Sequence, residues 1–559
     1  MLGGKHIVNT YNLFVVIFVA LGTFSTAYGL AIIGSTVGQP NFYTYFNLAP
    51  QDEPGYAHTT NIIGALNGVN SAGAIIGCLT SAYTADRYSR KRTIELGCII
   101  LIVGGTLCAG SISIGMFLAG RVIAGIGSGI LAVVVPMYQG EVATAETRGA
   151  MMCITGIMYA LGYSLAGWLG FACYFFPTDS PFATFSWRFP LAMQLVAPLV
   201  VLGGSAFIPF SPRWLLGQDR RDEAFEVVKR LHAKPDDPNH TTARSEFYLM
   251  EKQFELDKTF TMRPFEIFRT TPNLRRVFVA CLLMWGNQFL GIFVITNYGV
   301  LIYTSLGLLA FRPLLLNACW TTFTILGNSW TAFYVDRFGR RSFLLIGASG
   351  CVISLIFEAA LTAEFLGSTN TAALNATVFF LWFYILFWSS LIDATQYVYV
   401  AEIWPNHLRS QGTALGIAAF YLASEVTLVA APVALNDIGW KFYLVLICPS
   451  IVYIVLMYFV FPETKGRTLE EIGALFGDDQ HVASHWYDLS AEEKQKVAEN
   501  ALKLTEDGKL PPKAEVMAAS EMAAGRERNR SEKSSEKDVE VGAGEREMKV
   551  ENVEVGKKV

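Results

Sequence analysis

The residues best suited to chemistry in this sequence are charged side chains that recur with the same spacing. Glu141 precedes Arg148 by seven residues, and Glu402 precedes Arg409 by the same seven. The second pair follows the first by 261 residues. Carboxylate and guanidinium groups at neighbouring helix ends form ion pairs whose strength depends on their exposure to water. Such pairs can join two parts of a protein and release them without a covalent step.

Two charged turns add to the evidence for an internal repeat. Asp86-Arg87-Tyr-Ser-Arg90-Lys91-Arg92 follows one apolar run, and Asp336-Arg337-Phe-Gly-Arg340-Arg341 follows another. A single turn of this kind is explained by a basic loop on the cytoplasmic side. Two turns with Glu and Arg at matching places predict a gate, whose ion pairs hold two repeated halves together while the cytoplasmic side is closed. The residues assigned to the gate are Asp86, Arg92, Glu141, Arg148, Asp336, Arg340, Glu402 and Arg409.

Three acids lie inside apolar runs: Glu358, Asp393 and Glu425. An ionised carboxylate in the middle of a membrane costs at least ~2.5 kcal/mol, so such residues face a cavity or a partner. Asp393 lies nine residues before Glu402, deep enough to reach a central cavity. Asp393 or Glu425 could therefore carry a proton or bind a substrate group, and the alternative for each is a structural acid. For Glu358 we expect the structural role.

The composition is that of a membrane protein. Of the 559 residues, 52% are hydrophobic and 16% are charged, against about 25% charged in an average soluble domain. Residues 478–559 hold 33 of the 90 charges. This distribution excludes an ordinary soluble enzyme, a nucleic-acid binder and a fully disordered chain.

Twelve apolar runs are long enough to cross a bilayer as helices, which takes about 20 residues each. Lys and Arg collect in one set of connecting loops, whereas the alternate loops 34–58, 174–187 and 366–375 contain neither. This asymmetry predicts that both termini and the long central loop face the cytoplasm. The runs are 12–33, 59–82, 93–112, 116–138, 151–173, 188–210, 276–302, 313–335, 342–365, 376–400, 412–435 and 440–461.

These runs predict an all-α membrane protein with four parts. Residues 1–210 form an N-terminal six-helix half, 211–273 a cytoplasmic helical linker, and 274–477 a C-terminal six-helix half. Residues 478–559 form a charged, largely disordered cytoplasmic tail. Asn375-Ala-Thr377 is a glycosylation sequon that we place in an outside loop. Within 211–273, apolar residues from Asp222 to His232 follow a helical pattern.

No pattern in the sequence indicates covalent or metal chemistry. The nine cysteines stand singly, mostly inside apolar runs, without a CxxC motif or a Cys/His cluster. No combination of nucleophile and base is apparent. We therefore expect no metal, no cofactor and no enzymatic activity.

Six motifs at the ends of these runs together resemble the sugar porter family of the major facilitator superfamily, and residues 10–477 carry the resemblance. It implies two pseudo-symmetric six-helix halves, a central cavity and alternating access, and its details are similar to the fungal branch. The motifs are Asp86-Arg87-x-x-Arg90-Lys91-Arg92, Gly120-Arg121-x-x-x-Gly125-x-Gly127, Pro136-x-Tyr138-x-x-Glu141-x6-Arg148-Gly149, Ser211-Pro212-Arg213-Trp214-Leu215, Asp336-Arg337-Phe-Gly339-Arg340-Arg341 and Pro462-Glu463-Thr464-Lys465-Gly466.

The resemblance also implies where a sugar binds. The family's seventh helix reads Gln-Gln-x-x-Gly-x-Asn, and here it reads Asn287-Gln288-Phe-Leu-Gly291-Ile-Phe293. The family's fifth-helix Gln is replaced by Gly156, which leaves room for a larger sugar. Amide and aromatic side chains suit a polyhydroxylated ligand because they offer donors, acceptors and an apolar face without charge. The substrate-binding candidates are Gln288, Asn287, Asn297, Tyr298 and Tyr397.

One departure from the family's pattern bears on whether sugar transport is coupled to protons. Proton-coupled members of the family carry an Asp in the first helix opposite an Arg of the fourth. Gly29 stands in the place of that Asp here and cannot titrate, so Arg121 remains without that partner. This favours facilitated diffusion of a sugar, with a hexose as first choice, by a monomer in the plasma membrane. Three alternatives are a proton symporter that uses Asp393 or Glu425, a transporter-like sugar sensor, and a carrier of polyols or quinate-type cyclitols. The expected partners are a small-molecule sugar and the lipid bilayer, and no nucleic acid.

Overall fold

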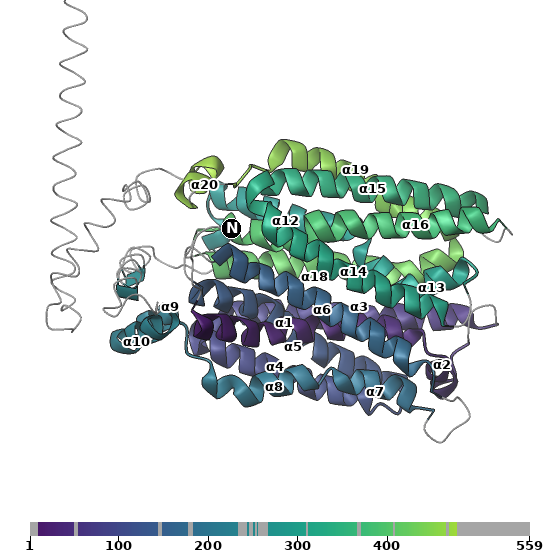
Figure 1. The fold of residues 1–559 in the computed structure, drawn as a ribbon, viewed down its shortest axis with the longest axis horizontal. Helices are drawn as coiled ribbons and strands as arrows, with labels where there is room; N and C mark the ends of the chain where they lie inside the picture. The colour runs from purple at the N-terminus through teal and green to yellow at the C-terminus, as the bar shows by residue number, and fades with distance from the viewer. Residues whose placement is uncertain are drawn as a thin grey trace, which may run out of the picture. The chain divides into compact units, whose positions relative to one another are not determined.

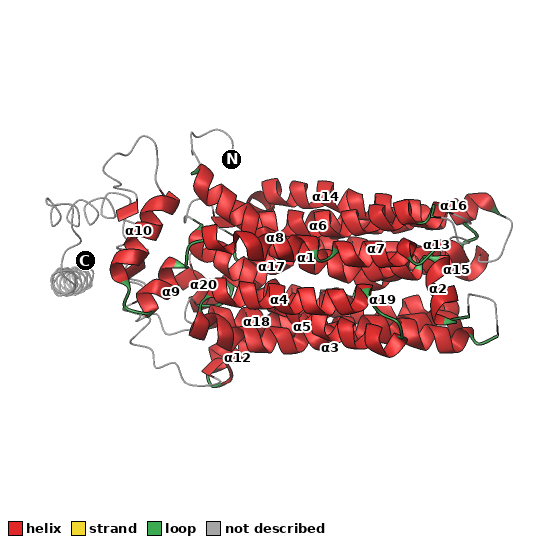
Figure 2. Cartoon of the chain, turned by 90° about the horizontal axis from the view of Figure 1, so that it is seen from below, coloured by secondary structure: helices red, strands yellow, loops and turns green. Residues whose placement is uncertain are grey.

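The computed structural model describes residues 9–49, 54–143, 148–176, 183–232, 266–308, 311–365, 370–405, 408–465 and 469–477, with a few residues between 243 and 254. All regular structure in these described residues is helical (Figure 2). They lie in one compact unit, Met1–Asp488. The tail 478–559, predicted to be disordered, lies outside the described residues.

The N-terminal half contains six spans, as predicted. The first five are single helices, and the sixth consists of two consecutive helices. They are α1 (Thr10–Val37), α3 (Tyr56–Tyr88), α4 (Arg90–Ala109), α5 (Ile114–Val142), α6 (Arg148–Cys173), and α7 (Phe185–Met193) with α8 (Val196–Gly204).

The C-terminal half repeats this order, but two of its six spans are broken. They are α12 (Thr271–Phe289) with α13 (Ile292–Ser305), α14 (Arg312–Phe338), α15 (Arg340–Phe365), α16 (Thr371–Phe387) with the π-helix η3 (Trp388–Ile392) and α17 (Asp393–Glu402), α18 (Arg409–Asp437) and α19 (Phe442–Val460). Together these spans confirm the predicted twelve-helix fold.

Eleven spans among the described residues are long and apolar enough to cross a membrane by composition alone. The one remaining span, α14, which is the eighth in chain order, is too polar to meet that criterion. Its polar side chains include Asn317, Thr321, Thr324 and Asn328, all of which are buried. Because α14 packs against α6 and η3, these groups face protein rather than lipid.

The two halves lie side by side along their length (Figure 1). They meet where α3 packs against α18 and where α6 packs against α14. Short helices cap the bundle: α2 (Pro40–Phe46) at one end, and α9 (Pro212–Gly217), α10 (Arg221–His232) and α20 (Leu469–Phe476) at the other. The end with α9, α10 and α20 is called the linker end below. The helix predicted from Asp222 to His232 is confirmed as α10.

The internal repeat is visible in the backbone. α4 and α15 both begin with an arginine, Arg90 and Arg340, and each follows a residue with positive φ. Gly339 has φ 94° and ψ 154°, and Ser89 has φ 96° and ψ 153°. Glycine adopts this conformation without strain, whereas a residue with a Cβ is strained there. The turn is therefore kept in both halves, although only one of them has glycine.

Two breaks in the C-terminal half were not predicted, nor was the division of the run 188–210 into α7 and α8. The run 276–302 is interrupted at Gly291, whose φ is 90°, so that α12 and α13 are separate helices. The run 376–400 contains the π-helical turn η3, directly before Asp393. Breaks of both kinds free backbone groups and redirect side chains, and they occur near functional sites.

The sequon at Asn375 lies on a helix, which corrects the predicted loop position. α16 already begins at Thr371, and Asn375 is exposed within its second turn. Thr377 is buried, and its hydroxyl donates to the Ala373 carbonyl at 3.1 Å. The helix extends beyond the apolar run because Asn370 caps it by accepting a hydrogen bond from the Ala373 amide.

Candidate substrate cavity and gate

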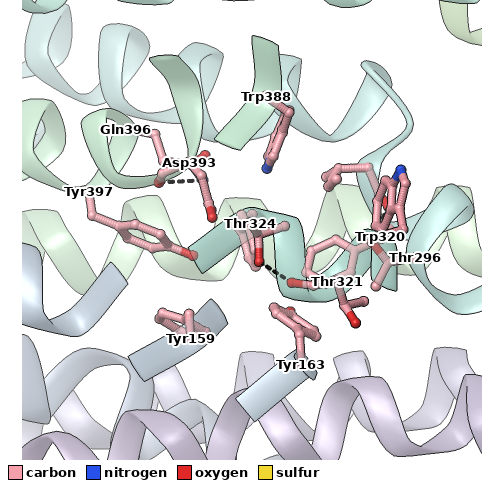
Figure 3. A pocket seen from close by; sticks show the side chains of 13 residues that line it. Tyr159, Tyr163, Thr296, Trp320, Thr321, Thr324, Trp388, Asp393, Gln396 and Tyr397 are labelled. Atoms are coloured by element: carbon pink, nitrogen blue, oxygen red, sulfur yellow. Dashed lines mark hydrogen bonds between the residues drawn. The ribbon is translucent and has the colours of Figure 1, made fainter. Parts of the chain in front are cut away.

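A small cavity lies between the two halves, in the middle of the bundle. Tyr159 and Tyr163 of α6 line it from the N-terminal half, as Figure 3 shows. The remaining lining residues come from the C-terminal half: Ile292, Phe293, Thr296, Trp320, Thr321, Thr324, Trp388, Asp393, Gln396, Tyr397 and Phe420. Its volume is about 40 Å³, whereas one water molecule needs roughly 10–15 Å³ by the same measure. The cavity therefore has room for a few waters, and a sugar needs the walls to move apart.

An aromatic pair closes the cavity across the boundary between the halves. The rings of Tyr159 and Tyr397 are stacked, with centroids 5.7 Å apart and planes at 6°. Tyr163 lies one helical turn after Tyr159, on the same face of α6. Stacked aromatic pairs contribute about 0.5–1.5 kcal/mol beyond the area they bury. The pair thus holds the halves together weakly enough to separate.

Hydroxyl groups on the cavity wall are oriented by their own helices. Thr296 donates to the Ile292 carbonyl at 2.7 Å, and Thr324 donates to the Thr321 carbonyl at 2.6 Å. Since each hydroxyl has one hydrogen, these bonds leave its lone pairs as acceptors. The wall therefore offers uncharged acceptors to a ligand with hydroxyl groups.

Asp393 is the acidic group of this cavity. It is the first residue of α17, directly after the π-helical turn. Its Oδ2 accepts a hydrogen bond from Nδ2 of Asn328 at 2.8 Å. The same Nδ2 lies 3.4 Å from the carbonyl oxygen of Gly156, on the opposite half. None of the thirteen lining residues is Lys, Arg or His, so the lining supplies no cation to the carboxylate.

The position of Gly156 fits this close approach of the halves. A Cβ at Gly156 would lie 3.2 Å from the Cβ of Ala394 and 3.7 Å from Oδ1 of Asn328. The predicted extra room at Gly156 is therefore wrong for this conformation. The space is filled by α14 and α17.

Asn287 does not line the cavity but supports a residue that does. Its Nδ2 donates to Oε1 of Gln396 at 3.0 Å, and its Oδ1 accepts from the Tyr453 hydroxyl at 2.9 Å. Gln396 also donates to the Asp393 carbonyl at 3.2 Å. Both ends of the Asn287 amide are thus occupied by protein groups, and Asn287 orients the cavity wall.

Gln288 is not one of the thirteen residues that line the cavity either, but its amide is only half satisfied among the described residues. The side chain is buried, its Oε1 lies 3.2 Å from the Ser424 hydroxyl, and its Nε2 has no partner among the described residues. Ser424 also donates to the Phe420 carbonyl at 2.8 Å, which occupies its one hydrogen. Whichever way the amide is turned, one of its ends lacks a partner. A buried polar group left in this way costs about 1–3 kcal/mol, and a ligand hydroxyl would satisfy it.

Asn297 and Tyr298 lie outside the cavity. Tyr298 donates to the Leu428 carbonyl at 2.8 Å and accepts from Asn67 at 2.9 Å, so it joins three helices. Asn297 donates to the Phe293 carbonyl of its own helix at 3.0 Å, and its buried Oδ1 has no partner among the residues described. Tyr298 therefore has the contacts of an interhelical residue in this conformation.

The other two acids are separate from the cavity. Glu425 lies on α18 against Gly68 of α3, with Oε2 buried and without a partner in the described part of the chain. Glu358 is buried on α15, and the Tyr443 hydroxyl of α19 donates to it at 3.3 Å. Of the acids considered, Asp393 is the one that lines the cavity.

Arg121 is satisfied by backbone groups. Its guanidinium donates to the Gly29 carbonyl at 2.8 Å and to the Leu66 carbonyl at 3.1 Å. The site opposite Arg121 is therefore occupied by peptide oxygens, without a titratable side chain at Gly29.

The charged cluster at the linker end of the N-terminal half is built around Arg90. Its guanidinium bonds to Glu141 at 3.0 Å and to Asp86 at 3.0 Å. The Ser211 hydroxyl donates to the other oxygen of Glu141. Tyr138, one turn before Glu141, donates to the Pro209 carbonyl at 2.7 Å. The cluster thus ties α3, α4 and α5 to the start of the linker.

The C-terminal half repeats this cluster. Arg340 bonds to Glu402 at 2.9 Å, and the Thr464 hydroxyl donates to the other oxygen of Glu402 at 2.8 Å. Tyr399 donates to the Pro462 carbonyl at 2.9 Å. Each pair joins helices of one half, whereas we expected pairs between halves. The Asp86 carboxylate does lie beside Ser410 of the C-terminal half.

One gate residue was misassigned. Arg92 pairs with Glu95, three residues further along the same helix, at 2.8 Å, and its side chain is 62% exposed. Arg90 takes the predicted place of Arg92. The side chains of Arg148 and Asp336 lie outside the described part of the structure. Arg409 is the first residue of α18, directly after the N-cap residue Leu408.

Several cavity residues escaped sequence reasoning. Tyr159 and Tyr163 gave a usable signal, since two tyrosines one turn apart lie in an apolar run. Trp388, Gln396 and the threonines of α14 gave none, because apolar and small polar residues surround them throughout. Among the described residues, no group of three His, Cys, Asp or Glu side chains could hold a metal ion.

Two six-helix halves around a central cavity, with matching charged clusters at one end, define a membrane transporter. The chain matches the family described as "Sugar (and other) transporter" over residues 15–476. It belongs to this family, which is a family of transporters and not of enzymes.

Relatives of similar length support the assignment. The MFS-type transporter criB of Aspergillus cristatus is 30% identical, and the match covers 87% of this chain and 97% of the relative. The sugar transporter STL1 of Saccharomyces cerevisiae is 28% identical, with coverage of 85% and 84%. The solved structure of the proton:xylose symporter XylE has the same fold, with a TM-score of 0.71, 23% identity, and coverage of 84% and 100%.

Proposed function

We propose that this chain carries a sugar, with a hexose as first choice, across the membrane by alternating access through the cavity. The single observation that carries the proposal is the cavity itself. Both halves line it, and its wall combines aromatic faces with uncharged donors and acceptors. Sugars are bound by this combination, because their hydroxyls need hydrogen bonds and their CH faces need apolar contact.

The same geometry suggests the movement. The cavity is too small for a hexose and closed by the Tyr159–Tyr397 pair, so one half must rotate away from the other before sugar enters. The Arg90–Glu141 and Arg340–Glu402 pairs keep each half rigid while it moves. Ion pairs within a half need not break at every cycle, and this distinguishes the proposal from a gate of pairs between halves.

The placement in the cell is also part of the proposal. Basic residues gather at the linker end, and the loops 34–58, 174–187 and 366–375 contain neither Lys nor Arg. The positive-inside rule then puts the linker end and both termini in the cytoplasm. We place the protein, as a monomer, in the plasma membrane.

Facilitated diffusion is the first candidate for how sugar transport is driven. The Arg121 guanidinium donates to the Gly29 carbonyl, and the glycine at this position has no side chain to titrate. A sugar would then move down its own gradient in either direction.

Proton symport is the second candidate, and Asp393 favours it. The acid lines the cavity with an amide partner and without a cation among the lining residues. A carboxylate in this setting is costly when ionised, so its charge would be neutralised by a proton while sugar is bound. Its Asn328 partner also contacts the opposite half, which would connect protonation to movement.

The experiment is uptake of labelled glucose by a yeast without hexose transporters that expresses this chain, with and without a protonophore. Uptake that survives the protonophore and stops at equal concentrations supports facilitated diffusion. Accumulation that the protonophore abolishes supports symport, and Asp393→Asn should then leave only exchange.

An absence of glucose uptake at normal surface abundance would contradict the hexose proposal. Competition by polyols or quinate for uptake of the same labelled compounds would then identify a carrier of those ligands. A chain that binds glucose but moves no solute would act as a sensor.

A further inference from the structure

A groove separate from the cavity lies at the linker end of the C-terminal half. It runs between α12, the end of α19 and α20, with a volume of about 630 Å³. None of its lining residues belongs to the sugar cavity. Phe476 of α20 packs beneath the guanidinium of Arg276, 5.1 Å from its ring centre, and this contact fixes one wall.

The part of the groove formed by α12 and α19 faces lipid. Leu274, Phe278 and Phe459 line it and are exposed, Phe459 by 79%. They belong to α12 and α19, which both cross the membrane. Apolar side chains exposed on such helices contact acyl chains rather than water. A ligand that fills the whole groove therefore needs an apolar part.

The groove also contains two guanidinium groups, those of Arg275 and Arg341. Arg275 is exposed, and neither an ion pair nor a hydrogen bond holds its side chain within the described residues. Arg341 donates to the Tyr458 carbonyl and lies 5.2 Å from the Tyr458 ring centre, while its Nε is buried and has no partner in the part of the chain that the structure describes. The nearby Glu463 carboxylate is occupied by the backbone amides of Arg340 and Arg341. The two guanidinium groups thus leave donors for an anion.

We propose that this groove binds an anionic phospholipid from the leaflet at the linker end. The headgroup phosphate lies between Arg275 and Arg341, and an acyl chain lies along Leu274, Phe278 and Phe459. A free anion would satisfy the arginines but leave the apolar wall unused. Basic pockets beside membrane helices, near the level of the headgroups, recognise lipids of this charge.

The groove also touches moving parts of the protein. α12 is the first part of the seventh span, which is broken at Gly291, and Arg341 follows the gate residue Arg340. A lipid bound in the groove would hold the C-terminal half in one orientation relative to the membrane surface. The inference depends on the membrane location and not on the identity of the sugar.

The test measures the thermal unfolding of the purified full chain in detergent with added lipid. Phosphatidylserine should raise the unfolding midpoint in a saturable way, and phosphatidylcholine with the same acyl chains should not. Arg275→Ala together with Arg341→Ala should weaken the apparent affinity for phosphatidylserine roughly 30-fold, since each cation contributes about 1 kcal/mol. Arg275→Ala alone should weaken it about fivefold, and it breaks no ion pair or hydrogen bond within the described residues.

A matched control comes from the repeat. Lys91 follows Arg90 as Arg341 follows Arg340, and it donates to the Ile208 carbonyl at 2.9 Å and lies 5.1 Å from the Phe210 ring centre. Lys91→Ala should therefore lose the equivalent structural contact but keep the response to phosphatidylserine. An equal response to both lipids, an equal loss in Lys91→Ala, or the same stabilisation by inorganic phosphate alone would each overturn the proposal.

Discussion

Asn287 and Gln288 are adjacent amides that the structure assigns to different tasks. Asn287 holds Gln396 and Tyr453, so both ends of its amide are occupied. Gln288 has one buried end without a partner in the described structure. We therefore expect Gln288 to bind sugar directly and Asn287 to hold the wall in place. Substitutions that keep shape but remove hydrogen bonding, Gln288→Met and Asn287→Leu, separate these two tasks.

The expected magnitudes follow from the contacts. Gln288→Met removes one neutral hydrogen bond to the ligand, worth about 0.5–1.5 kcal/mol, so KM should rise roughly 2- to 12-fold. Its effect on folding should stay within about 1 kcal/mol, because Ser424 keeps its bond to the Phe420 carbonyl. Asn287→Leu should destabilise the protein by about 2–4 kcal/mol, since Gln396 loses its partner and Tyr453 keeps only the Leu283 carbonyl at 3.5 Å.

Two assays on the same variants decide the question. Initial rates of labelled glucose uptake, at matched surface abundance, give KM and the maximal rate. Thermal unfolding of each purified variant in detergent gives its relative stability. Unchanged uptake kinetics in Gln288→Met would remove that residue from the site. A stable Asn287→Leu protein with a raised KM would show that the two tasks are reversed.

Three further predictions concern the acid, the strained turn and the contact between the halves. For facilitated diffusion, in which Asp393 stays ionised while sugar is bound, Asp393→Asn should raise KM for uptake roughly 10- to 150-fold, because a hydrogen bond to a charged group contributes about 1.5–3 kcal/mol; an unchanged KM would contradict contact between an ionised Asp393 and the sugar. Ser89→Gly should raise the unfolding midpoint by the equivalent of about 1 kcal/mol, since relief of the strain at φ 96° exceeds the small loss of the cap; a lower midpoint would mean that no strain is stored there. Gly156→Ala should lower the maximal rate more than it changes KM, because its Cβ would press on Ala394 at 3.2 Å. Gly203→Ala, with nothing within 4 Å, is the matched control, and equal rates in the two variants would contradict the reasoning.

The twelve spans could be predicted because a lipid bilayer allows few backbone conformations. A buried backbone in lipid must satisfy its own hydrogen bonds, so a run of about 20 apolar residues permits little other than a helix. Even α14, which does not qualify by composition alone, is predicted from the apolar run 313–335. The breaks at Gly291 and before Asp393 were missed because an apolar run reads the same whether its helix is straight or broken.

The error at Arg92 has a geometric reason. Arg90, Lys91 and Arg92 are consecutive, and successive residues of a helix point about 100° apart. The turn at Ser89 sets where α4 begins, and it directs Arg90 inward to Glu141 and Arg92 outward. The sequence shows three positive charges but not the phase of the helix. The same limit applied to Asn287 and Gln288, whose different roles depend on which neighbours each one meets.

Asn328 connects the contents of the cavity to the contact between the halves. Its Nδ2 serves the Asp393 carboxylate at 2.8 Å and approaches the Gly156 carbonyl of the other half at 3.4 Å. A proton on Asp393, or a sugar hydroxyl that donates to it, competes for the lone pairs that now accept from Asn328. Released from the carboxylate, the amide is free to bond more closely with Gly156. By linkage, whatever occupies Asp393 must shift the balance between joined and separated halves, and separation of the halves must change the affinity at Asp393 by the same factor.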